Sequence, residues 1–240
     1  MAKKKKNAGE SVEEQKSIPR QAVLFELENL AIKGRQLVYD VLKKALADKN
    51  VELNMNMFSR YCSQPSAKYF LPLMMKMDAK AKAPEPKLIT DITDAINNVF
   101  VSSSLKLDSG LAKLLKVMQE QNAVIAALSS LNDETAKRLA ANLELVDRGI
   151  TLLSYPSHEK NFPSADAWLK LAKKISVPPS SCVVIASSSV SCKAALSAGM
   201  RSVVVPDKYT SCQDFGGADF VFDNFDNEAI GHIIELMKAD

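Results

Sequence analysis

The sequence predicts an α/β fold with a doubly wound, mostly parallel sheet and a helical cap inserted after the first strand. Short apolar runs of strand length, such as Ala22–Phe25 and Cys182–Ala186, are bounded by polar residues. From Leu111 onward these runs alternate with segments of helical periodicity, a pattern typical of parallel sheets covered on both faces. Between the first run and Leu111 the pattern is helical throughout, which indicates an insert.

The composition is that of an ordinary globular protein, with 47% hydrophobic and 25% charged residues. No apolar run approaches the roughly 18–20 residues of a membrane span. The net charge of +3 comes from Lys3–Lys6, because 31 basic residues less these four leave 27 against 28 acidic ones. We therefore expect no membrane partner and no specific nucleic-acid partner.

The four cysteines form no CxxC pair and lie near no cluster of histidines. No apolar segment follows the N-terminal lysines, so the start of the chain does not resemble a secretory signal. Reduced thiols in a cytoplasmic protein are therefore expected. These cysteines are Cys62, Cys182, Cys192 and Cys212.

Residues 1–17 are polar and charged, and we predict a disordered basic tail there. Contact of its lysines with nucleic acid or an anionic surface is the alternative. We assign 18–34 and 103–240 to the α/β core and 35–102 to the helical cap. Within the cap we expect helices at Gly34–Asn50, at Met55–Met77 with a break near Pro65, and at Leu88–Val101, with a loop at Ala79–Pro86.

The core is predicted to alternate helices with strands. After Ala22–Phe25, the expected strands are Ala123–Leu128, Ile150–Ser154, Cys182–Ala186, Ser202–Val205 and Asp219–Phe222. The expected helices are Leu111–Gln121, Asp133–Leu143, Ser164–Ile175, Val190–Ala198 and Asn227–Lys238. Asn132 or Asp133 suits the N-cap of its helix, and Gly199 suits the position after a helix end.

Two carboxylates, Glu26 and Glu28, follow the first strand. Side chains alternate along a strand, so residues two apart should share one side. In open α/β sheets, ligands bind at the carboxyl ends of the strands. Ser129 and Ser187 follow two other predicted strands and should lie at the same edge. The pair of glutamates therefore indicates an active-site position.

At these residues the sequence resembles the haloacid dehalogenase-like (HAD) hydrolase superfamily, in its helical-cap subgroup of phosphoglycolate phosphatase and β-phosphoglucomutase. The resemblance runs from about Ile18 onward. It is carried by VLFELENLA, AVIAALSS, NFPSADAWLKLAKKISVPPSSCVVIASSSVSCKAALSAGM and ADFVFDN. It implies a HAD-like Rossmannoid core. In active members it also implies phosphoryl transfer through an aspartyl-phosphate beside Mg²⁺.

Several positions depart from the family's pattern. The resemblance places Glu26 at the nucleophile and Glu28 at the acid/base position, where the family has aspartates. Ser129 matches the phosphate-binding hydroxyl. The family's lysine aligns with Phe162, and Lys160 reaches that place only with a local shift. The acidic metal ligands are replaced by two residues of other types, Ala186 and Ser187.

These losses act on one transition state, so the resemblance predicts a catalytically inactive relative with a binding or interaction role, for a small anionic ligand or a protein partner. No cofactor is then expected. The alternative is an atypical phosphatase that uses Glu26 and Glu28 with Mg²⁺, supported by Asp207 or Lys160. A third hypothesis is a scaffold that docks a partner through the Met-rich cap or the lysine tail.

Each candidate residue also has an alternative interpretation without a catalytic role. Glu26 and Glu28 can be solvated acids, and the Ser129 hydroxyl can form a hydrogen bond with a neighbouring helix. The run Ser187–Ser189 fits a helix cap or an anion site. The remaining candidates can be ordinary loop or surface residues without a catalytic role. They are Asp207, Asp223, His158 and His232.

Overall fold

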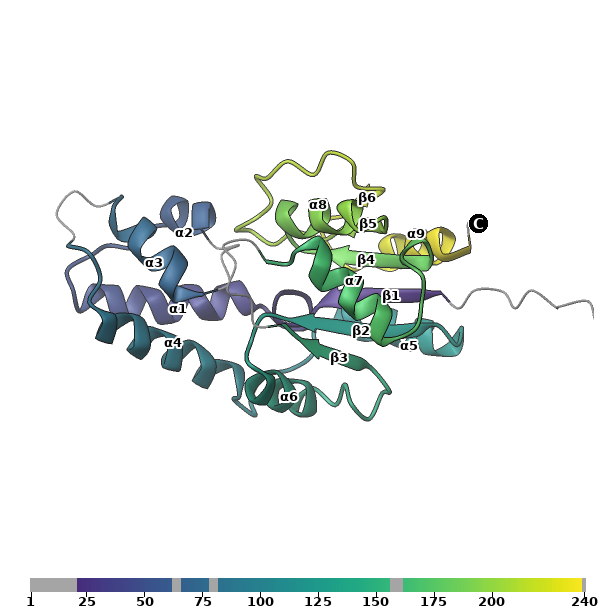
Figure 1. Cartoon of the computed structure of the whole chain (residues 1–240), viewed down its shortest axis with the longest axis horizontal. Helices are drawn as coiled ribbons and strands as arrows, with labels where there is room; N and C mark the ends of the chain where they lie inside the picture. The colour runs from purple at the N-terminus through teal and green to yellow at the C-terminus, as the bar shows by residue number, and fades with distance from the viewer. Residues whose placement is uncertain (1–20, 62–65, 78–81, 156–161, 239–240) are drawn as a thin grey trace, which may run out of the picture.

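The computed structural model describes residues 21–61, 66–77, 82–155 and 162–238. The predicted tail, the break near Pro65, His158 and Lys160 lie outside these ranges. Figure 1 shows one group of helices gathered at one end of an elongated molecule and the sheet with its covering helices at the other. In the described part of the chain, no helix has the length and apolar character to span a membrane.

The described strands form one six-stranded sheet in the order β3-β2-β1-β4-β5-β6. All five strand pairings are parallel, which confirms the predicted fold class. The first strand is central and completely buried, so its carboxyl end opens at the middle of one sheet edge. The strands are β1 (Ala22–Glu26), β2 (Val124–Ser129), β3 (Thr151–Ser154), β4 (Cys182–Ala186), β5 (Arg201–Val204) and β6 (Phe220–Val221).

Helices cover both faces of this sheet, as the alternation of patterns predicts. Val23 and Phe25 of β1 face a core built with α5 (Ser109–Glu120), α6 (Asp133–Asn142) and α9 (Asn227–Lys238). Ala22 and Leu24 face the opposite core, built with α7 (Ala165–Lys174) and α8 (Ser189–Ser197). The period of two along a strand thus divides one apolar run between two cores.

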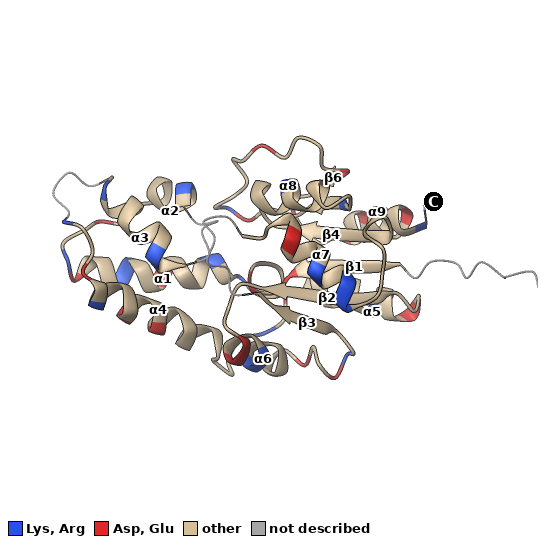
Figure 2. Cartoon of the chain, viewed as in Figure 1, with Lys and Arg blue, Asp and Glu red and all other residues tan. Residues whose placement is uncertain are grey.

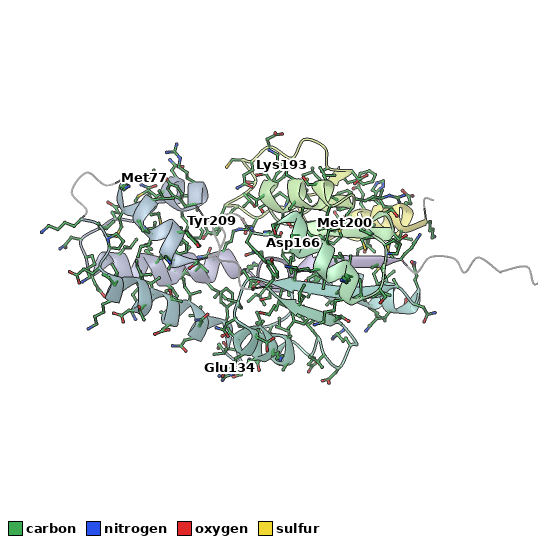
Figure 3. The ribbon with its side chains drawn as sticks, viewed as in Figure 1. Met77, Glu134, Asp166, Lys193, Met200 and Tyr209 are labelled. Atoms are coloured by element: carbon green, nitrogen blue, oxygen red, sulfur yellow. The ribbon has the colours of Figure 1, made fainter. Side chains whose placement is uncertain are left out.

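The helices between β1 and α5 have a hydrophobic core of their own. They are α1 (Gly34–Ala47), α2 (Met55–Tyr61), α3 (Ala67–Met75) and α4 (Pro86–Phe100), and we call them the cap helices. Met57, Met74 and Met75 are buried in this core, as expected for methionines at helical spacing. One residue of the cluster, Tyr209, comes from the loop after β5 and lies at the boundary between the cap helices and the sheet (Figure 3).

Most predicted elements are present with shifted ends. The side chain of Asn132 accepts a hydrogen bond from the Thr135 amide and caps α6. Gly199 has a φ of 72° after α8, which confirms its position at the helix end. The helix predicted to reach Asn50 ends at Ala47, and the last strand contains only Phe220 and Val221. Strand β1 extends one residue further than predicted, to Glu26.

Candidate active site

The chain leaves β1 through a π-helical turn, Leu27–Ala31, rather than through more extended strand. The alternation of side chains along the strand therefore stops at Glu26. The prediction that strand geometry places Glu26 and Glu28 on the same side is wrong. The Glu26 carboxylate contacts residues beyond β4, whereas the Glu28 carboxyl contacts residues at the end of β2. Both residues are buried, with whole-residue relative exposures of 3% and 5%, so the alternative of solvated acids is also wrong.

Glu28 lies against the carboxyl end of β2. Its Oε1 accepts hydrogen bonds from the Ser129 hydroxyl at 2.5 Å, the Ser130 amide at 2.9 Å and the Leu131 amide at 3.2 Å. Burial raises the pKa of the Glu28 carboxyl above its ordinary value, and these hydrogen bonds only partly offset that effect. The hydroxyl and both amides thus bind an oxygen supplied by the protein itself.

Glu26 lies against the carboxyl end of β4. Its Oε1 accepts a hydrogen bond from the Ser187 amide at 2.9 Å, and its Oε2 accepts one from Asn29 Nδ2 at 3.1 Å. Ser187 follows β4, the strand that pairs with β1. The predicted gathering of Glu26 and Ser187 at one sheet edge is therefore present, and backbone and amide donors hold the carboxylate in one orientation.

A buried arginine, Arg35, lies beside Glu26. Its Nη1 donates to Asp207 Oδ2 at 3.0 Å, its Nη2 donates to Ser187 Oγ at 2.9 Å, and Nη2 lies 3.9 Å from Glu26 Oε2. Sequence reasoning missed this residue. The available signal was its spacing, since Arg35 precedes the buried Leu42 by seven residues and so falls on the apolar face of α1.

Gly34 brings Arg35 to the end of β1. A Cβ atom on Gly34 would lie 2.3 Å from the carbonyl oxygen of Glu28, which is too close for any side chain. The absence of a side chain therefore lets α1 begin directly against the π-helical turn. Asp207, predicted as a loop acid, does lie in the loop after β5 and in addition forms the ion pair with Arg35.

The serine run after β4 is a helix cap. The Ser188 hydroxyl accepts a hydrogen bond from the Ser191 amide, and the Ser189 amide donates to Gln213 Oε1 at 2.8 Å. The protein therefore satisfies these donors at the start of α8, which favours the cap over the anion site. Ala186, the last residue of β4, is buried and carries no ligand atom on its side chain.

A cavity of about 80 Å³ lies between the two glutamates and the cap helices. Phenylalanines form much of its wall, and they include Phe162, the residue that aligns with the family's lysine. Arg35 also lines it and is already paired with Asp207. The lining includes Glu26, Glu28, Ser130, Phe58, Phe70, Phe100 and Phe162.

Two further candidate residues, His232 and Asp223, do not line this cavity. His232 stacks on Phe220 with ring centroids 4.4 Å apart, and its Nδ1 lies 3.1 Å from Glu235 Oε2. Asp223 is exposed, as predicted for a loop acid. Figure 2 shows basic and acidic residues interspersed along the cap and core helices.

The residues around the cavity do not fit a Mg²⁺ ion. Among the described residues, no group of three or more histidine, cysteine, aspartate or glutamate side chains is placed to hold a metal. Mg²⁺ needs oxygen ligands at short, near-octahedral distances. Here the guanidinium of Arg35 lies among the candidate oxygens of Glu26, Ser187 and Asp207.

Comparisons with known proteins agree with this architecture. A sequence model of the family described as "Haloacid dehalogenase-like hydrolase" matches residues 23–205. A CBBY-like protein of Arabidopsis thaliana is 31% identical over 121 residues, which are 50% of this chain but only 38% of that protein. The chain thus matches about two-fifths of that relative's length.

Two solved structures have a similar fold. CbbY from Rhodobacter sphaeroides, in complex with xylulose-(1,5)-bisphosphate, has a TM-score of 0.71 and 19% identity, over 86% of this chain and 95% of that one. β-Phosphoglucomutase from Clostridium difficile also has a TM-score of 0.71 and 19% identity, over 91% and 97% of the two chains. At this identity the likeness establishes the fold alone.

Proposed function

This chain belongs to the haloacid dehalogenase-like hydrolase family, and we propose that it has lost phosphohydrolase activity and serves as a binding or interaction protein. The observation that carries the proposal is the position of Glu28. Its Oε1 accepts the Ser129 hydroxyl and the amides of Ser130 and Leu131. The resemblance assigns that hydroxyl to phosphate, so a phosphate ester would have to displace a buried carboxyl group from its donors.

The surroundings of Glu26 support the same conclusion. An attacking carboxylate must reach phosphorus in line with the leaving group, and displacement by about 1 Å can cost roughly 10²-fold in rate. Glutamate is one methylene longer than aspartate, and three contacts to Ser187, Asn29 and Arg35 hold this one in place. Its freedom to adopt an attacking geometry is correspondingly small.

The cavity also lacks an available positive charge among its described lining residues. Phe162 lines it at the position that aligns with the family's lysine, and Arg35 is already paired with Asp207. The charge of Arg35 is already shared between Asp207 and Glu26, so a phosphate group entering beside Glu26 would not gain the neutralisation that phosphoryl transfer requires. Weak binding of phosphate esters and no turnover are the expected results.

Turnover of a generic phosphate ester with Mg²⁺ tests this proposal. We expect the wild-type protein and the Glu26→Ala variant to give the same background rate, because Glu26 attacks no substrate. A rate above the protein-free background that is equal in both proteins shows activity that does not use Glu26, such as that of a contaminating phosphatase. Turnover that Glu26→Ala abolishes would contradict the proposal and favour the alternative, an atypical phosphatase that uses Glu26 and Glu28 in place of aspartates.

The cap helices offer a surface for the interaction role. Leu73 of α3 is 38% exposed, Met55 at the start of α2 is 40% exposed, and Met77, in the turn after α3, is 39% exposed. Flexible apolar side chains of this kind adapt to protein partners. Pull-downs with the full chain, a chain lacking residues 1–16 and a Leu73→Ser/Met77→Ser variant would separate binding by the lysine tail from binding by the cap helices. Binding that persists when the deletion and both substitutions are combined in one chain would exclude both surfaces.

A further inference from the structure

We propose that the guanidinium of Arg35 is the resident cation of this site and replaces the divalent metal ion of active relatives. The inference deepens the proposed function and rests on it, because the resemblance to active relatives tells where the metal ion would bind. The acidic residues at the sheet edge need a neutralising charge, because metal ligands of the usual kind are replaced there by Ala186 and Ser187.

Three segments of the core direct oxygen atoms to one place. Glu26 ends β1, Ser187 follows β4, and Asp207 lies in the loop after β5. Because β1, β4 and β5 are neighbours in a parallel sheet, their carboxyl ends meet at one edge. This is the arrangement expected of a cation site.

The Arg35 side chain reaches all three oxygens. Nη1 donates to Asp207 Oδ2 at 3.0 Å, and Nη2 donates to Ser187 Oγ at 2.9 Å and lies 3.9 Å from Glu26 Oε2. A guanidinium stays charged at every pH at which proteins are folded, and its planar fork binds several oxygens at once. It therefore supplies fixed positive charge where a metal ion would otherwise supply it.

Burial makes this charge necessary. The side chains of Glu26 and Arg35 are each 4% exposed, and a buried carboxylate without a partner is strongly unfavourable. A divalent ion entering the same place would meet the guanidinium at close range and be repelled. The guanidinium and a divalent ion therefore exclude each other. The site can be stable although Ala186 and Ser187 stand where the family has acidic metal ligands.

The inference predicts that removal of the guanidinium restores a cation site. Mn²⁺ binding, measured by electron paramagnetic resonance, and thermal melting are compared for the wild type and Arg35→Ala. Arg60→Ala, which changes an exposed arginine on α2, is the matched control. We expect Arg35→Ala to bind about one Mn²⁺ at least about tenfold more tightly than the other two proteins.

Guanidinium at millimolar concentration should raise the Tm of Arg35→Ala and leave the Tm of the wild type and Arg60→Ala unchanged, because only the first protein has room for it. If Arg35→Ala does not fold, Arg35→Gln retains the stem and is expected to bind Mn²⁺ more tightly than the wild type. Mn²⁺ bound to the wild type and lost in Glu26→Gln would overturn the inference.

Absence of both Mn²⁺ binding and guanidinium rescue in a folded Arg35 variant would overturn it as well. These readouts are independent of turnover. Failure of the proposed function would appear instead as phosphate-ester hydrolysis by the wild type that depends on Glu26.

Discussion

Arg35 Nη1 donates a hydrogen bond to Asp207 Oδ2 at 3.0 Å, across 172 positions of the chain. The bond joins the first turn of α1 to the loop that follows β5. Since α1 begins the cap helices and β5 belongs to the sheet, one ion pair connects the two parts of the molecule directly at the cavity. Its strength can be tested from either partner.

Asp207→Asn should lower the free energy of unfolding by about 1–3 kcal/mol, because it removes the charge that faces a buried guanidinium. The Asp207 side chain is 33% exposed, so solvent screening favours the lower end of this range. Urea unfolding measures the loss. The control is Asp214→Asn, whose side chain is 81% exposed and 3.9 Å from Lys193. Equal losses in both variants would contradict a special role for the Arg35 pair.

Gly34→Ala should destabilise the protein by about 1–3 kcal/mol or more, because the new Cβ would lie 2.3 Å from the Glu28 carbonyl oxygen and the backbone cannot yield cheaply. The matched control is Gly231→Ala within α9, where a Cβ meets nothing within 4 Å. That change should stabilise the protein by about 0.5–1 kcal/mol through helix propensity. In urea unfolding, the two substitutions should change the free energy of unfolding in opposite directions. A Gly34→Ala variant as stable as the wild type would contradict the close packing at this position.

Stability should fall with rising pH because of Glu28, whose pKa is raised by burial above the ordinary value of 4.5. Between the ordinary pKa, which applies to the unfolded chain, and the raised pKa of the folded state, folded Glu28 keeps a proton that the unfolded chain has released. The contribution is complete below pH 4.5 and is lost as the pH rises through the folded-state pKa. The glutamate thus opposes folding at neutral pH.

Glu28→Gln should remove this pH dependence, because the amide oxygen still accepts from Ser129 but carries no charge. At pH 8 the free energy of unfolding of the variant should exceed that of the wild type. The excess should be about 1.4 kcal/mol for each pH unit by which the Glu28 pKa of the folded state exceeds that of the unfolded state, and the two proteins should be equally stable near pH 4. Unfolding midpoints across this pH range measure the difference. Exposed Glu52→Gln should follow the wild-type profile. A Glu28→Gln profile parallel to the wild type would count against the raised pKa.

Tyr209 should be important for the attachment of the cap helices. Its ring lies 4.7 Å from that of Phe58 and 5.6 Å from that of Tyr39, and its hydroxyl donates to Gln36 Oε1 at 2.8 Å. Tyr209→Ala should cost about 3–5 kcal/mol, whereas Tyr209→Phe should cost only about 1 kcal/mol. Calorimetry of both variants checks the ratio, and similar losses would mean that the hydroxyl, not the ring, dominates.

Much of the fold could be predicted from the sequence because local patterns determine it. Cys182–Ala186 and Asn227–Lys238 have the predicted ends, since each is an apolar or periodic run with clear polar boundaries. The sequence predicts a longer last strand, Asp219–Phe222, but only Phe220 and Val221 pair with β5. Pairing with a neighbour depends on tertiary structure and leaves no mark in a single sequence.

The site was predicted only in part. Glu26, Ser129 and Ser187 gather at one sheet edge because the carboxyl ends of parallel strands must do so. The direction of Glu28 depends on the π-helical turn, for which the sequence has no recognised signal. Arg35 was missed because an arginine at a helix start is ordinarily exposed. Its partner Asp207 is far away in sequence, so no local pattern connects them.

The position of Arg35 also bears on what a metal site at this sheet edge would require. An aspartate introduced at position 187 would meet the guanidinium and form an ion pair, so it would not be free to bind a metal ion. Aspartates introduced at positions 26 and 28 would leave that cation and Phe162 in place. Metal-dependent phosphoryl transfer at this edge would therefore need both a change at Arg35 and new acidic ligands, and neither change alone is sufficient.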